Sequence, residues 1–193
     1  MDLNLDKGEN MVLVHRVKNH EQHKQELLKR INKYEDDENM RWDHYYGDFQ
    51  VSPFVDQSEA PEYMKYFYAN MADDIMRSIG NKLGLGLYNA EIHKLWYQRY
   101  EKEDFHDFNN HAGCHFANCY FLELPDNKYK TQIFDRTSEI QYSAKEGDVI
   151  TFPAYLAHRS PINESQDIKT IIAWNSSYGK LGSDAIEGNN PFV

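Results

Sequence analysis

Residues 146–163 read EGDVITFPAYLAHRSPIN and combine a short apolar run, a proline turn and a single histidine. The run at 148–153 is rich in β-branched and aromatic residues and follows a glycine, which is typical of a buried strand. His158 comes shortly after this run and is followed at once by Arg159. An imidazole at the end of a buried strand indicates a point where other polar side chains of the chain meet.

Similar β-rich runs fill the second half of the chain, with turn residues between them. They cover residues 91–100, 114–124, 131–135, 139–144, 147–153 and 167–177. Strands of this length and number favour a two-sheet sandwich or a jelly roll. Periodicity alone does not choose between these two architectures.

The N-terminal part shows helical periodicity instead. Apolar residues recur at helical spacing among charges over 20–39, and again every four residues over 61–83, where Pro61 suits a first helical turn. No linker or repeat divides the chain. We therefore expect one mainly β domain over residues 1–193, with a helical part at about 1–90 and a β core at about 91–178.

Composition limits the class of protein. The formal net charge is −10, which disfavours nucleic acid and anionic lipid as partners. Cys114 and Cys119 are five positions apart on one expected strand, so their side chains would face opposite ways and form no disulfide. The N-terminus has neither a secretory signal nor a membrane-spanning run. We expect a soluble cytoplasmic protein that acts on a small molecule or a peptide.

The segment DFNNH offers candidate metal ligands. In a strand, Asp107, Asn109 and His111 would share one face because side chains repeat every two residues. A jelly roll can bring this segment beside His158, and two imidazoles with an oxygen ligand suit a first-row divalent metal. Singly, most histidines of a chain are ordinary surface or core residues.

Lys169 lies in the apolar run DIKTIIAWN, where Ile171 and Ala173 would share its face. A buried ammonium group needs a partner, and no acid on that strand face supplies one. An acidic cosubstrate would do so. The alternative is an exposed sheet edge, with the lysine stem lying over apolar surface.

Residues 96–175 resemble the Fe(II)/2-oxoglutarate-dependent dioxygenases, in particular small prolyl-hydroxylase-like proteins of marine bacteria and phages. The likeness lies in the strand ending in QRY, the GDVITFP run with its following histidine, and the later basic residue. It implies a double-stranded β-helix, or jelly roll, in which His158 is the distal iron ligand. It also implies that Lys169 and Tyr100 hold the distal carboxylate of 2-oxoglutarate.

The resemblance implies a hydroxylase that uses Fe(II), 2-oxoglutarate and O₂ on an unidentified substrate, and it allows a homodimer and a phage origin. The family carries an HxD or HxH pair where this sequence has Asn109 and His111. The third ligand therefore stays open between the neutral carbonyl of Asn109 and the carboxylate of Asp107, or the metal is lost. His106 and His115 are further candidates.

Two other classes stay open. GDVITFPAYLAH approximates a cupin signature, although Tyr155 stands where that signature has glycine. A cupin-like protein would bind a metal without 2-oxoglutarate. A jelly roll without a metal would act as a binding protein, with the polar segment as a solvated strand end.

Overall fold

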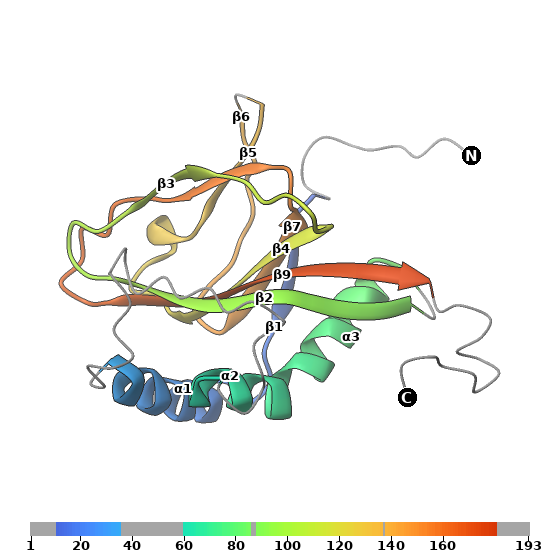
Figure 1. The fold of residues 1–193 in the computed structure, drawn as a ribbon. Helices are drawn as coiled ribbons and strands as arrows, with labels where there is room; N and C mark the ends of the chain where they lie inside the picture. The colour runs from blue at the N-terminus through green and yellow to red at the C-terminus, as the bar shows by residue number, and fades with distance from the viewer. Residues whose placement is uncertain (1–10, 36–59, 86–87, 137, 181–193) are drawn as a thin grey trace.

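The structure is a computed structural model that describes residues 11–35, 60–85, 88–136 and 138–180. Two antiparallel sheets face each other, and the helices cover the outer face of the larger sheet (Figure 1). This arrangement confirms the predicted mainly β jelly roll with N-terminal helices.

The larger sheet has the strand order β1-β7-β4-β9-β2. Its strands are β1 (Leu13–Arg16), β7 (Asp148–Pro153), β4 (Phe116–Glu123), β9 (Lys169–Lys180) and β2 (Tyr88–Tyr100). Strand β1 was not expected in the N-terminal part, and it pairs antiparallel with β7. Its four residues are too few to show a clear alternation in the sequence.

The smaller sheet has the order β3-β8-β5-β6. Its strands are β3 (His106–Asn109), β8 (Ala157–Ser160), β5 (Gln132–Asp135) and β6 (Ser138–Glu139). The strand expected at 139–144 is reduced to β6, and the following residues lie outside any strand. Cys114 precedes β4 and Cys119 lies within it, so the expected single strand carrying both cysteines is wrong, although both are free thiols.

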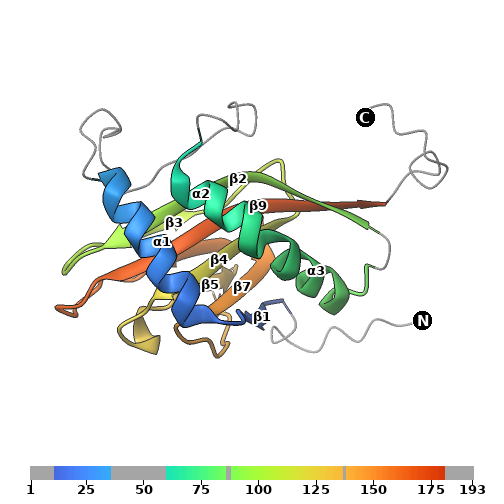
Figure 2. The same ribbon diagram turned by 90° about the horizontal axis from the view of Figure 1, so that it is seen from below.

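Helix α1 (His20–Glu35) and the helices α2 (Glu62–Phe67) and α3 (Asp73–Lys82) lie across the larger sheet (Figure 2). The helix expected over 61–83 is interrupted by a π-helical turn at Tyr68–Ala72, and a 3₁₀ turn covers Asn127–Tyr129. None of the helices in the described ranges is both long enough and apolar enough to cross a bilayer.

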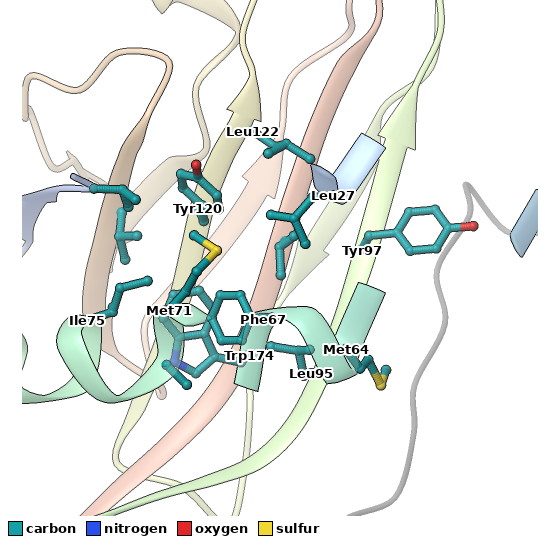
Figure 3. Packing of buried hydrophobic residues seen from close by; sticks show 14 of the residues in the cluster. Leu27, Met64, Phe67, Met71, Ile75, Leu95, Tyr97, Tyr120, Leu122 and Trp174 are labelled. Atoms are coloured by element: carbon teal, nitrogen blue, oxygen red, sulfur yellow. The ribbon is translucent and has the colours of Figure 1, made fainter. Parts of the chain in front are cut away.

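Each face of the larger sheet has its own apolar cluster. The helix-side cluster packs Leu27, Phe67 and Trp174 between helices and sheet (Figure 3). The inter-sheet cluster includes Phe121 and Ile171 and fills the space toward the smaller sheet. Burying one such side chain stabilises the fold by about 1.5–3 kcal/mol, so both faces contribute to folding.

Candidate metal centre

A cavity of about 100 Å³ lies between the two sheets. Of the residues expected to form a site, Tyr100, Asn109, His111 and His158 line it. They come from β2, the end of β3, the following loop and β8. Four residues that span 59 positions of sequence are thereby brought to one cavity.

His111 and His158 lie ring to ring, with centroids 5.1 Å apart. The Nδ1 atom of His158 is 3.1 Å from the carbonyl oxygen of Leu156. Because a carbonyl only accepts, Nδ1 carries the proton and Nε2 presents a lone pair. Histidines that bind metals usually donate their other N–H to such a carbonyl, which fixes the ring orientation.

Burial favours the neutral form of both rings. Desolvation, together with the neighbouring histidines, lowers the pKa of His158 to about 4, despite the hydrogen bond to Leu156 that opposes this shift. Desolvation also lowers the pKa of His111. Neutral imidazole is the form that binds a metal, so neither ring must lose a proton first at neutral pH.

Asn109 stands directly opposite His158 in the β3–β8 ladder. Its Oδ1 atom is buried and has no hydrogen-bond partner in the described part of the chain. A buried polar atom left unpaired costs about 1–3 kcal/mol. A cation or a donor in the cavity would remove this cost.

Asp107 does not reach the cavity. It is exposed, and its Oδ1 accepts a hydrogen bond from the backbone N–H of Phe108 at 2.7 Å. The expectation that Asp107 and Asn109 share a face is wrong because β3 contains a bulge. His106 pairs with Ser160 and Asn109 with His158, so a step of three residues on β3 spans a step of two on β8.

The remaining histidine candidates differ in position. His106 lines the cavity, and its Nδ1 lies 2.9 Å from the carbonyl of Asp107. His115 is exposed and its Nδ1 accepts a hydrogen bond from the backbone N–H of Tyr178 at 3.2 Å. His115 is therefore held in a structural contact outside the cavity lining.

Lys169 is completely buried, with 0% of its surface exposed, which rules out the exposed-edge alternative. Its Nζ donates a hydrogen bond to Ser160 Oγ at 2.6 Å and lies 4.7 Å from the ring centroid of Tyr100. No carboxylate of the described residues forms an ion pair with it. Desolvation lowers the pKa of Lys169 to about 8.

Tyr100 and Lys169 face each other across the β2–β9 ladder. The Tyr100 hydroxyl donates to Gln98 Oε1 at 3.0 Å. Lys169 contacts Ser160 and Tyr100, and both of these residues line the cavity. A cation and a phenol thus lie together at the cavity wall.

Trp96 and Asn175 also line the cavity. The sequence pattern singles out neither of them as a site residue. The two-residue period of a strand could have identified Asn175, because this residue shares one face of the strand with Lys169, Ile171 and Ala173.

A second cluster of metal-binding residue types, His20, Glu21 and Glu146, lies at the start of α1. Two of its three residues already have partners: His20 Nδ1 is 2.6 Å from the Tyr120 hydroxyl, and Glu146 Oε1 is 2.7 Å from Lys24 Nζ. An ammonium group in this position repels a cation. We interpret this cluster as a polar network that holds α1 to the sheet.

No family model matches the sequence, and no curated protein matches it. Solved structures do match the fold. An oxidoreductase of the 2OG-Fe(II) oxygenase family from Burkholderia pseudomallei matches with a TM-score of 0.52 at 14% identity, over 61% of this chain and 58% of that one. This chain thus spans just over half the length of that protein.

Two further structures match over most of both chains. A prolyl hydroxylase from Trichoplax adhaerens, in complex with a hypoxia inducible factor oxygen degradation domain peptide fragment, has a TM-score of 0.57 at 13% identity, over 89% of this chain and 84% of that one. SnoN, a non-heme alpha ketoglutarate dependent epimerase from nogalamycin biosynthesis, has a TM-score of 0.62 at 13% identity, over 86% and 77%. The chain therefore has the fold of 2-oxoglutarate/iron(II) oxygenases of known structure.

Proposed function

We propose that this protein is an iron(II)- and 2-oxoglutarate-dependent dioxygenase that hydroxylates a peptide or a small metabolite. The observation that carries the proposal is the content of one inter-sheet cavity. It combines two neutral imidazoles, a buried carboxamide oxygen without a partner, and an adjacent buried ammonium without a carboxylate. These are the groups that an iron ion and a small dianion would require.

In this proposal His111, His158 and Asn109 hold the iron. His158 would bind through Nε2, because its Nδ1 is committed to Leu156. The unpaired Oδ1 of Asn109 would be the oxygen ligand, and Asp107 is excluded from this role by its outward position. When bound, iron with 2-oxoglutarate supplies the oxidising chemistry that uses O₂ to hydroxylate a C–H bond.

Lys169 and Tyr100 would hold the distal carboxylate of 2-oxoglutarate. A buried ammonium without a counter-ion is unfavourable, and a carboxylate next to it would form a charge-assisted hydrogen bond. Ser160 already orients the ammonium group through its hydroxyl oxygen. The role of the protein groups is to bind and orient the cosubstrate and to exclude water.

The neutral ligand set has a consequence for affinity. Two imidazoles and a carboxamide carry no charge, so the protein does not compensate the two charges of the iron ion. A dianionic cosubstrate would compensate them. We therefore expect the metal to bind weakly alone and much more tightly when 2-oxoglutarate is present.

The test is an anaerobic titration of the protein with Fe(II), with and without 2-oxoglutarate, followed by the visible charge-transfer absorption of the iron chelate. We expect the band only when both are present, and a decreased 2-oxoglutarate affinity in Lys169→Met. Metal binding without the band would favour the cupin-like alternative. Absence of any divalent metal binding would favour the metal-free jelly roll and overturn the proposal.

The substrate class is supported only by the fold neighbours, one of which is bound to a peptide. Either a peptide or a small metabolite suits a cavity of about 100 Å³, which would admit a side chain or a compact molecule. The single domain, the homodimer and the cytoplasmic location expected from the sequence stay predictions.

A further inference from the structure

Two more buried polar groups beside the histidine pair have no hydrogen-bond partner among the described residues. Trp96 is 5% exposed and its indole Nε1 makes no hydrogen bond. Asn175 is 7% exposed and its Oδ1 makes none either. Both residues line the cavity that contains His111 and His158. One group is a donor and the other is an acceptor.

The strand register places the two side chains next to each other. Trp96 pairs with Ala173 across the β2–β9 ladder, so Asn175 is its diagonal neighbour on the same face. Such neighbours are about 7–8 Å apart, within reach of aromatic and other long side chains and of one small ligand group between them. The indole ring is 5.7 Å from the ring of His111, which places the pair beside the candidate metal ligands.

Two other buried carboxamides, those of Asn118 and Asn163, are paired by described residues. Asn118 donates to Trp174 O and Ser176 Oγ and accepts from Thr151 Oγ1. Asn163 donates to two backbone carbonyls and accepts from a backbone N–H. Since buried polar groups in folded proteins are normally paired, the unused oxygen of Asn175 indicates a partner other than the described residues, such as a ligand in the cavity.

We propose that Trp96 and Asn175 form a subsite that binds an amide group of the substrate. The amide carbonyl would accept from Trp96 Nε1, and the amide N–H would donate to Asn175 Oδ1. A carboxylate would place a lone pair against Asn175 Oδ1, and an ester or a tertiary amide would leave this oxygen unpaired. This inference rests on the proposed function, because it names the substrate class of the same cavity.

The indole N–H signals provide a direct test. The chain has three tryptophans, so a ¹H–¹⁵N spectrum of the full-length protein contains three indole signals, and Trp96→Phe identifies the one from Trp96. The probe is acetamide, compared with N,N-dimethylacetamide and with acetate. The indole of Trp174 is an internal control, because its Nε1 is also buried and unpaired but belongs to the helix-side cluster.

We expect acetamide to shift the Trp96 signal downfield in a saturable way and to leave the Trp174 signal in place. N,N-dimethylacetamide and acetate should bind about tenfold more weakly, a ratio that corresponds to about 1.4 kcal/mol. Asn175→Ala should remove this preference, and Asn118→Ala should retain it in the folded protein. If Asn175→Ala does not fold, Asn175→Leu provides the same comparison, because leucine is similar in size and has no acceptor for the amide N–H.

Three results would overturn the subsite: a Trp96 signal that no probe moves because only an ordered water occupies the site, equal shifts with all three probes, or an unchanged preference in Asn175→Ala. Parallel titrations with Zn²⁺ and 2-oxoglutarate separate this inference from the proposed function. An acetamide response without 2-oxoglutarate binding would refute the oxygenase and retain the subsite. The reverse result would refute the subsite alone.

Discussion

The two faces of the larger sheet differ in what they bury. On the helix side, Ile172 and Trp174 of β9 pack with Phe67 and Leu27 in an apolar cluster. On the inter-sheet side, the alternate residues of the same strand include Lys169, whose ammonium group is buried without a carboxylate. One strand supplies both because its side chains alternate between faces. The helix-side cluster stabilises a sheet whose other face contains buried polar groups that cost free energy.

The largest expected effect is on stability and comes from the helix side. Trp174→Ala should lower the free energy of unfolding by about 3–5 kcal/mol, because it removes a completely buried indole and leaves a cavity. Urea denaturation measures this change. The metal affinity of the remaining folded protein should stay at the wild-type value. A loss of metal binding in the folded fraction would show that the two faces are not independent.

The next effect is on the inter-sheet side and has the opposite sign, because the buried ammonium group of Lys169 lowers the free energy of unfolding. The pKa of Lys169 is lowered to about 8 by desolvation, below the 10.5 of an exposed lysine, so the unfolded chain binds more protons between these values. The Lys169 contribution to stability should therefore rise with pH from about 8 to 10.5, by about 3 kcal/mol. The nearby thiol of Cys119 contributes in the opposite direction above about pH 9, because its pKa is raised from 9.0 to about 11 by folding. Comparison of the wild type with a Lys169 variant separates the two contributions.

Lys169→Met should abolish this rise and be up to about 3 kcal/mol more stable than the wild type at pH 7, since it removes the buried charge. It should also lose 2-oxoglutarate affinity. Urea denaturation at several pH values, performed without cosubstrate, measures the effect. An equal pH dependence in both proteins would assign the rise to another group.

A smaller effect concerns the imidazoles. His158→Ala should lower the affinity for a divalent metal at least about 100-fold, because it removes a ligand itself. Loss of a group that only hydrogen-bonds to a metal ligand costs about 10–100-fold. Competition with a chelating dye measures it. His115→Ala is the matched control, because that histidine is exposed and lies outside the cavity. Equal losses in both variants would contradict the site.

The smallest effect concerns the third ligand. Asn109→His should tighten metal binding about tenfold in the absence of 2-oxoglutarate, because imidazole is a better ligand than a carboxamide. Asp107→His is the control and should change little, since Asp107 points to solvent. A gain in Asp107→His instead would transfer the ligand role to that position.

Particular residues show where prediction from sequence succeeded. The β-rich runs at 147–153 and 167–177 form β7 and β9. Both runs are rich in the β-branched and aromatic residues that favour strands. Prediction failed at β1 and at β3. A four-residue strand has no readable period, and the bulge that turns Asp107 outward depends on pairing with β8.

The candidate site likewise contains residues that were predicted from sequence and one choice that only the structure could make. Residue chemistry pointed to His111, His158 and Lys169, and the family resemblance implied Tyr100. The structure places His111, His158 and Tyr100 along one cavity and Lys169 in contact with its wall. The sequence left the oxygen ligand open between Asn109 and Asp107. Only the pairing of the strands distinguishes these two residues. It buries the side-chain oxygen of Asn109 and leaves the carboxylate of Asp107 exposed.

The sequence by itself determined the longer helices and strands, the apolar alternation that buries both faces of β9, and the types of group available for chemistry. Tertiary structure decided which polar atoms are left unpaired, including Asn109 Oδ1, Asn175 Oδ1 and Trp96 Nε1. The physical reason is the distance along the chain over which each property is set. Periodicity is a local property of the chain, whereas the pairing of a buried polar atom depends on every strand and loop that surrounds it.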